Sequence, residues 1–216
     1  MKKILLASLV ASACVCAQAS SDFAIYGSAG TGYGLGMIKP VSESWNVRAD
    51  YTSFVYDKST ISGQIQYDAA VRLRDVAAYS DYKPFGGNSD FRMTAGIVHS
   101  NSGITMTGSA AGGNFVINGV TVPAAGEYLN ARIKMPSTRP YLGIGWGMAN
   151  LNQKGWMTGL DLGVMIGRPT VEIDASAGVK NAVSAADIEA ERQKIQDKVR
   201  FLRYEPVIKL SVGYKF

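Results

Sequence analysis

Residues 205–216 read EPVIKLSVGYKF and end the chain on a strictly alternating pattern. The first parity is apolar, with two aromatics at its end: Ile208, Leu210, Val212, Tyr214 and Phe216. The second is polar or small: Lys209, Ser211, Gly213 and Lys215. A period of two is that of a β-strand, whose successive side chains point to opposite faces. Such an apolar strand invites aggregation in a soluble protein, whereas in a membrane barrel its apolar face meets lipid. The stretch therefore predicts the closing strand of a membrane β-barrel.

The first 19 residues have the organisation of a secretory signal peptide. Lys2 and Lys3 form a basic start, residues 4–16 are apolar, and AQA at 17–19 offers a cleavage site. The apolar run is shorter than the roughly 20 residues that a membrane-spanning helix needs. Both cysteines lie in this segment, so the exported part, residues 20–216, contains none and has the length of one domain.

The composition of the exported part gives no indication of nucleic-acid binding. Without the two leader lysines the chain has 20 basic and 17 acidic residues, although the whole sequence carries a formal charge of +5. It is rich in glycine (24) and tyrosine (11), only 18% of it is charged, and it has no second apolar run long enough for a membrane helix. This profile fits a soluble β-sandwich or a membrane barrel.

Alternating segments recur along the chain before the terminal strand. They cover 23–37, 45–57, 61–85, 91–99, 127–134, 141–149 and 156–166, with a short tail at 171–174. The segment 61–85 is either one long strand or two strands divided near Arg74 and Asp75, because Asp75 interrupts its apolar parity. Residues 101–126 have weak periodicity and predict a long loop. Residues 184–203 predict a solvated helix, with Ser184 as its N-cap.

The non-apolar parity of these segments indicates the lining of a narrow barrel. In 23–37 and 141–149 it is dominated by glycine, which leaves room for large side chains from the opposite wall. Elsewhere it carries the predicted lumen charges: Arg48, Asp50, Asp68, Arg72, Arg92, Asp161, Glu172 and Lys209. Because unpaired buried charge is costly, we expect these residues to pair across the lumen and fill it rather than to select a solute.

The outer parity carries aromatics near the strand ends. Trp45 and Trp156, together with Tyr214 and Phe216, predict an aromatic girdle at a membrane interface. A soluble sandwich would instead place many lysines, glutamates and serines on its polar face. We therefore predict an all-β protein: a transmembrane antiparallel up-and-down barrel of about eight strands, with one short helix in a connecting loop and a lumen filled by side chains. Residues 39–43 and 84–87 both look like short periplasmic turns. The strands as divided above do not place both of them on the periplasmic side.

In its order of motifs the mature chain resembles the small outer-membrane β-barrels of Gram-negative bacteria, of the OmpA/OmpX/OmpW-like kind. The resemblance rests on YGSAGTGYGLG (26–36), KPFGG (83–87) before FRMTAGIV (91–98), RPYLGIGWG (139–147), LDLGVMIGRP (160–169) and the terminal P-x-x-x-L-x-x-G-Y-x-F (206–216). It implies insertion into outer-membrane lipid and lipopolysaccharide by an assembly machinery that reads Tyr214 and Phe216 as a signal. It implies no agreed activity. We expect a monomer with no cofactor, no metal site and no nucleic-acid partner.

Three functions remain open from the sequence. The first is a structural or surface role with a sealed lumen. The second is lateral transport of small hydrophobic molecules, as in OmpW-like barrels. The third is a lipid A-modifying enzyme, for which the chain offers His99, Ser100, Ser102 and Glu127. Alternation places His99 on the opposite face from both serines, so we expect an interfacial histidine and no catalytic site.

Overall fold

A computed structural model describes residues 23–62, 65–86, 89–110, 112–148 and 154–216. The predicted signal peptide lies outside the described residues, as does part of the glycine-rich turn near residue 87. Within the described ranges, no helix is long and apolar enough to cross a membrane.

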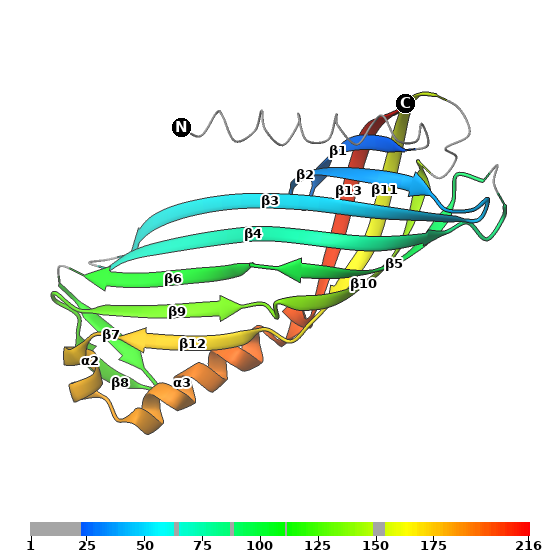
Figure 1. Ribbon diagram of the computed structural model, residues 1–216. Coiled ribbons are helices and arrows are strands. Elements are labelled where there is room, and N and C mark those ends of the chain that lie inside the picture. Colours follow the sequence, from blue (N-terminus) through cyan, green and yellow to red (C-terminus); the bar gives the residue numbers. More distant parts are fainter. Residues whose placement is uncertain (1–22, 63–64, 87–88, 111, 149–153) are drawn as a thin grey trace.

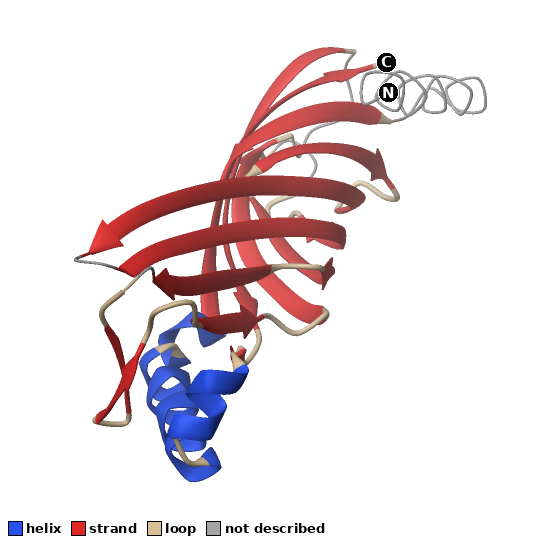
Figure 2. Cartoon of the chain, turned by 90° about the vertical axis from the view of Figure 1, so that its left-hand side faces the viewer, coloured by secondary structure: helices blue, strands red, loops and turns tan. Residues whose placement is uncertain are grey.

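Eight strands of the described chain form a closed antiparallel ring (Figures 1 and 2). They are β1 (Ala24–Gly30), β2 (Tyr33–Pro40), β3 (Trp45–Ser62), β4 (Ile65–Tyr82), β5 (Arg92–Ser100), β10 (Thr138–Gly147), β11 (Gly155–Ile166) and β13 (Tyr204–Lys215). The terminal strand β13 lies between β1 and β11, and the pairing of β4 with β5 closes the ring. The fold is therefore that of an antiparallel transmembrane β-barrel, which confirms the predicted class.

The sheet continues beyond one end of the ring as an open extension of five strands. Its strands are the far halves of β3 and β4 together with β6 (Gly103–Ala110), β9 (Tyr128–Lys134) and β12 (Thr170–Ala175). β6 continues β5 after a break at Asn101 and Ser102, and both keep the same register against β4. In the same way β9 leads into β10. Below, "the extension" means this open sheet with the elements that cover it.

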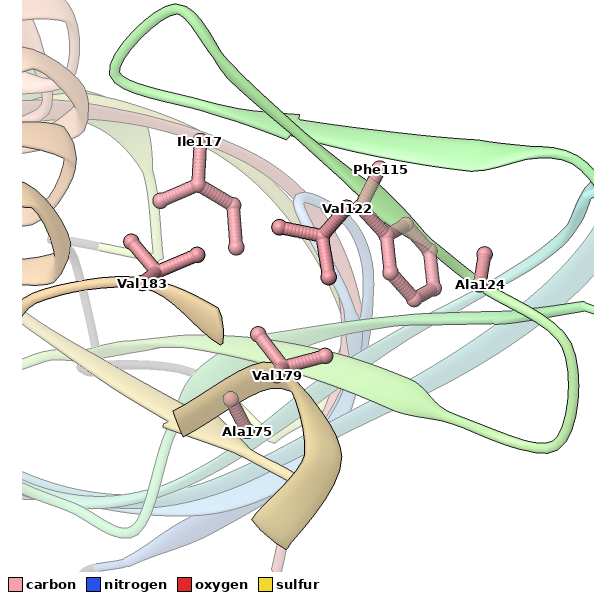
Figure 3. Packing of buried hydrophobic residues seen from close by; sticks show 7 residues of the cluster. All are labelled: Phe115, Ile117, Val122, Ala124, Ala175, Val179 and Val183. Atoms are coloured by element: carbon pink, nitrogen blue, oxygen red, sulfur yellow. The ribbon is translucent and has the colours of Figure 1, made fainter. Parts of the chain in front are cut away.

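A hairpin and two helices cover the far end of the extension (Figure 3). The hairpin is formed by β7 (Asn114–Ile117) and β8 (Val120–Pro123); the helices are α2 (Ala177–Ala182) and α3 (Ala185–Lys198), followed by the 3₁₀ turn η2 (Arg200–Arg203). Together with the end of β12 they bury one apolar cluster: Phe115, Ile117, Val122, Ala124, Ala175, Val179 and Val183. The extension therefore has a hydrophobic core of its own, separate from the barrel.

Helix α3 lies along β12 and covers the edge of the sheet. The backbone N–H of Val171 donates to Oε1 of Gln196 at 3.0 Å, and Nε2 of Gln196 donates to the carbonyl of Pro169 at 2.8 Å. Ser184 caps the helix, as predicted, because its hydroxyl accepts from the N–H of Asp187 at 3.1 Å. A side chain of the helix thus makes two of the hydrogen bonds that a neighbouring strand would otherwise make with this edge.

Two predicted elements are wrong in their division. The segment 23–37 is not one strand but the hairpin β1–β2, with its turn at Thr31 and Gly32. Glycines line both of its strands, so the turn glycine does not stand out in the sequence. Residues 101–126 are not a long loop, because they contain β6, β7 and β8. Thr105, Thr107 and Ser109 form the outer, polar face of β6, and this weakens the apolar alternation that marks a strand.

The hairpin β1–β2 explains how the turns at 39–43 and 84–87 can lie at the same end of the barrel. It adds one reversal early in the chain, so the turns after β2 and after β4 fall at the same end of the barrel. The start of β1 and the C-terminal end of β13 lie there too, since Ala24 is paired with Lys215. We call this the terminal end, and the end that carries the extension the far end. The 61–85 segment contains one continuous strand, β4, because its pairing with β3 runs unbroken from Ile65 to Tyr82.

The two faces of the sheet exchange polarity where the ring ends. Around the ring the outer face is apolar and exposed, as at Val76, Ile97 and Leu142, while the inner face carries buried charged residues together with buried apolar ones. In the extension, residues that continue the inner face are apolar: Val71, Leu73, Ile104, Ile133, Val171 and Ile173. Residues that continue the outer face are polar: Gln66, Asp68, Arg72, Thr105, Arg132, Lys134 and Glu172. The exchange marks where a lipid-facing wall becomes a water-facing sheet.

Candidate functional site: the ion network of the lumen

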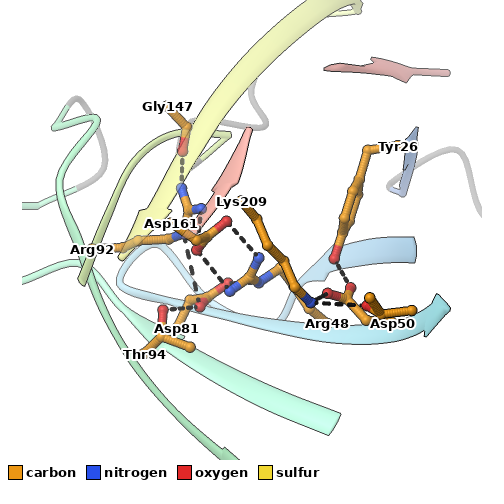
Figure 4. A network of polar contacts seen from close by, with 10 residues as sticks. Tyr26, Arg48, Asp50, Asp81, Arg92, Thr94, Gly147, Asp161 and Lys209 are labelled. Carbon is orange, nitrogen blue, oxygen red and sulfur yellow. Dashed lines mark hydrogen bonds and ion pairs between the residues drawn. The ribbon is translucent and has the colours of Figure 1, made fainter. Parts of the chain in front are cut away.

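Four charged side chains from four strands meet inside the barrel near its terminal end (Figure 4). Arg48 Nε lies 2.7 Å from Asp81 Oδ2, and its Nη2 lies 3.1 Å from Asp161 Oδ1. Arg92 Nη2 lies 2.7 Å from the same Asp161 oxygen. All four side chains are at most 3% exposed. The two guanidinium groups and two carboxylates therefore form one charge-balanced cluster that spans the lumen.

A second ion pair adjoins this cluster. Lys209 Nζ lies 3.1 Å from Asp50 Oδ2 and donates to Thr52 Oγ1 at 3.1 Å. The hydroxyl of Tyr26 donates to the other oxygen of Asp50. The sequence suggested that Lys209 would seek an acidic partner, and the structure places it beside Asp50. The ionised side chains of the two groups balance, with three positive and three negative, so neither sign is left in excess.

An apolar layer lies above the charges, toward the far end. It consists of Ala77, Tyr79, Val98, Tyr141, Met165 and Val207. The rings of Tyr79 and Tyr141 meet edge to face with centroids 4.9 Å apart. The guanidinium of Arg48 lies 5.0 Å from the centroid of Tyr79, a cation–π distance. The tyrosine thus joins the apolar layer to the charged one.

A third, polar layer closes the lumen at the far end. Arg139 pairs with Glu205, donates to the hydroxyl of Ser100 at 2.8 Å, and lies 3.8 Å from Asp75. Ser102 donates to Asp75 at 2.9 Å. Between this layer and the apolar one remains a cavity of about 20 Å³, room for about one water molecule. In the described residues, side chains of the three layers thus occupy the lumen at these levels, with this small cavity between two of the layers.

Glycines allow this packing. A Cβ at Gly145 would lie 2.7 Å from Cζ of Arg92, and one at Gly36 would overlap the ring of Tyr26. At Gly143 it would lie 2.5 Å from the hydroxyl of Tyr141. The glycine stripes seen in the sequence are thus the space that large lumen side chains occupy.

Three of the predicted lumen charges lie elsewhere. Asp68 and Arg72 belong to the half of β4 that pairs with β6, and Glu172 belongs to β12, so all three lie on the extension. Arg72 and Glu172 are at least half exposed. The prediction is wrong for these residues because the faces exchange polarity at the ring. The structure places the other five, Arg48, Asp50, Arg92, Asp161 and Lys209, inside the barrel.

The sequence reading did not identify Asp81, Asp75, Arg139 or Glu205 as lumen residues. In β4 the inward parity of the ring is odd, whereas the prediction extended the even parity of its solvated half. Asp75 was the available indication, because it interrupts an apparently outward apolar parity. In the structure Asp75 begins the inward series that continues to Asp81.

The four aromatics predicted as a girdle lie at the terminal end. Trp45 packs on Tyr82 with ring centroids 4.8 Å apart, and Trp156 packs on Tyr214 at 5.6 Å. Phe216 adjoins Tyr214, again at ring-contact distance. Trp156 is 80% exposed. These rings form a band at the level of the terminal turns, where an aromatic girdle belongs.

The candidate enzyme residues do not assemble. His99 is exposed on the outer face of β5, while Ser100 and Ser102 face inward and bond to Arg139 and Asp75. Glu127 lies at the covered end of the extension, against Gly178 of α2. No base–nucleophile pair results from these residues.

Comparisons with known proteins agree with the fold. No model of a known protein family matches the chain, and no curated protein matches its sequence. Two solved structures from Acinetobacter baumannii are similar in fold. CarO superposes with a TM-score of 0.56 at 20% identity, over 91% of this chain and 97% of CarO. CarO2 superposes with a TM-score of 0.60 at 15% identity, over 90% of this chain and 98% of CarO2. At these identities the likeness concerns the barrel architecture.

Proposed function

We propose that this protein is an integral outer-membrane β-barrel with a sealed lumen, and that its role is structural or surface-exposed, carried by the extension. The observation that supports a sealed lumen best is the charge-balanced cluster of Arg48, Arg92, Asp81 and Asp161. A passage for solutes would have to break ion pairs between side chains that are at most 3% exposed, which is costly.

The proposed orientation puts the terminal end in the periplasm and the extension outside the cell. Its support is the difference between the two ends. Short turns connect β2 to β3 and β4 to β5 at the terminal end, whereas the far end carries a folded unit with its own core. Barrels of the bacterial outer membrane have short periplasmic turns and larger extracellular loops.

Cysteine labelling in intact cells tests the orientation, because the exported chain has no cysteine. Thr60→Cys lies on the extension, and its matched control Ser42→Cys lies in a terminal turn; both positions are exposed. A membrane-impermeant maleimide should label residue 60 in intact cells and residue 42 only after lysis. The reverse pattern would refute the orientation. Conductance in planar bilayers tests the seal: we expect no channel steps, and regular steps at low voltage would contradict it.

Lateral passage of small hydrophobic molecules is a second candidate, favoured by one observation. β2 pairs with β3 only as far as Ser53, although β3 runs on to Ser62, and β1 ends its pairing with β13 at Gly30. Above this short hairpin the wall lacks two strands, a width of roughly 14 Å. The small cavity of the lumen lies behind it, lined by Thr31 and Leu73 among others. Proteoliposomes should then equilibrate a small apolar fluorophore faster than protein-free vesicles; equal rates would exclude this function.

A further inference from the structure

A basic groove crosses the outer face of the sheet where the barrel meets the extension. It has a volume of about 420 Å³ and is open to the outside. Four basic side chains line it: Arg72 and Arg74 from β4, and Arg132 and Lys134 from β9. Asn101, Thr105 and Ser137 add polar groups to the lining. Ser100 and Ser102 also border the groove, but their hydroxyls point inward to Arg139 and Asp75.

The groove exists because two strands are interrupted side by side. β5 gives way to β6 at Asn101, and β9 gives way to β10 around Pro136, which has no N–H to donate. Beside the break, Gly103 lies in register between Arg72 on one side and Lys134 on the other. A glycine there leaves the floor between the two basic residues free of side chain. The two basic strands are thus separated by a strip of floor about 10 Å wide.

The basic residues of the groove are weakly neutralised. Arg72 lies 3.4 Å from Asp57 and Lys134 lies 2.7 Å from Glu172, but these pairs are about half exposed and contribute little. Arg74 and Arg132 are exposed, and no ion pair joins either of them to another residue in the described ranges. The groove therefore presents a net positive charge, with two guanidinium groups available for an anion.

Directly beside the groove, toward the terminal end, the same outer face becomes the apolar wall of the barrel. On β4 the outward residue after Arg74 is Val76, which is 57% exposed. On β5 and β10 His99 and Thr138 lie at the level of Val76. The apolar wall of these two strands begins nearer the terminal end, with Ile97 and Leu142, which are 60% and 54% exposed. On the other side of the groove the face is polar. An anionic group in the groove would thus stand at the upper boundary of an apolar surface.

We propose that this groove binds the phosphorylated headgroup of an outer-leaflet amphiphile of the lipid A class, with the acyl chains lying along the apolar wall. The proposal rests on the orientation proposed above, which brings the groove to the outer leaflet. Arginine suits this ligand because its planar fork donates two hydrogen bonds to phosphate oxygens. Arg74 and Arg132 make the main contacts, and Arg72 and Lys134 add to the field.

Binding of purified full-length protein in an uncharged detergent tests the proposal. The probes are phosphorylated lipid A, the same lipid without phosphates, phosphatidylglycerol and inorganic phosphate. Native mass spectrometry or calorimetry reports each affinity. The variant is Arg74→Gln/Arg132→Gln. The matched control is Lys58→Gln/Arg200→Gln, which removes two exposed positive charges that lie outside the groove.

Phosphorylated lipid A should bind best, and the groove variant should bind it at least tenfold more weakly, which corresponds to about 1.4 kcal/mol. The control should stay within about twofold of the wild type. Equal binding of dephosphorylated lipid A, or equal weakening in both variants, would overturn the proposal. So would a preference for phosphatidylglycerol, or inorganic phosphate binding as tightly as the lipid. Because this binding is measured in micelles, it can fail while the cysteine labelling succeeds, and the reverse.

Discussion

Replacing Asp161 by Asn should destabilise the barrel strongly, because this carboxylate joins both guanidinium groups of the lumen cluster. It accepts from Arg48 at 3.1 and 3.3 Å and from Arg92 at 2.7 Å, and its side chain is 3% exposed. The amide keeps the shape and removes the charge, so the two guanidinium groups are left with Asp81 alone. Removing one partner of a buried ion pair costs about 3–5 kcal/mol. Domains typically have a total stability of about 5–15 kcal/mol, so much of it would be lost.

Urea unfolding of the protein refolded in lipid vesicles, followed by tryptophan fluorescence, measures this loss. The matched control is Arg92→Met combined with Asp161→Asn, which removes one charge of each sign. If the cost arises from unpaired charge, the double variant should be more stable than the sum of its two single changes predicts, by at least about 1 kcal/mol. A single Asp161→Asn variant within about 0.5 kcal/mol of the wild type, a surface-like effect, would refute the reasoning. The lumen would then be hydrated well enough to solvate its arginines.

Three further predictions concern assembly, packing and the extension. Deleting Phe216 should sharply reduce the heat-modifiable protein in the outer membrane; unchanged levels would contradict its role as an assembly signal. Gly36→Val should cost about 1–3 kcal/mol in the same urea assay, because its Cβ would overlap the lumen side chains of Tyr26 and Asp50. Gly27→Val is its control, since a Cβ there meets nothing closer than 3.9 Å, and equal costs would argue against a crowded lumen. Hydrogen bonds from Ser184 and Asn118 hold the pKa of Asp187 below its ordinary value of 3.8. The stability from these bonds is present above that value and is lost as the pH falls through the lowered pKa, so the hairpin β7–β8 should exchange its amide hydrogens faster there; Asp187→Asn should show no such pH step.

Strand periodicity gave the barrel class correctly because the rule behind it is local. A residue that faces lipid must be apolar and its neighbour must fit a lumen, so alternation is visible within any ten residues of a wall. The terminal strand β13 shows this best, since its exposed and buried residues alternate over its whole length. Turns were harder to predict. The turn at Thr31 and Gly32 contains a glycine, but the two strands beside it contain glycines too, so glycine alone does not mark the turn.

The charged residues of the lumen could be predicted only in part. The sequence does not show whether a charged residue on a strand lies within the ring or in the extension. Arg48 and Arg72 look alike in sequence: each is a polar residue between apolar ones. Arg48 lies inside the barrel with 2% of its side chain exposed, and Arg72 lies outside it with 55% exposed. The difference arises from pairing. Arg48 of β3 lies opposite Tyr79, in the half of β4 that pairs with β5 in the ring, whereas Arg72 lies in the half that pairs with β6 in the extension. Pairing between distant strands is not contained in local periodicity.

The exchange of polarity at the ring boundary links the seal, the orientation and the groove. A strand such as β4 crosses from lipid to water without a break, so its outer face must change from apolar to polar at the membrane surface. The change falls between Val76 and Arg74, and it is there that β5 and β9 are interrupted and the basic groove opens. If the extension made no contact with lipid headgroups, any polar residues would suffice at this level. Instead four basic residues lie at this level, which the proposed orientation brings to the outer-leaflet phosphates. Behind them the charges of the lumen cluster are balanced. This asymmetry is why we propose a binding site on the outer wall of the barrel rather than in its interior.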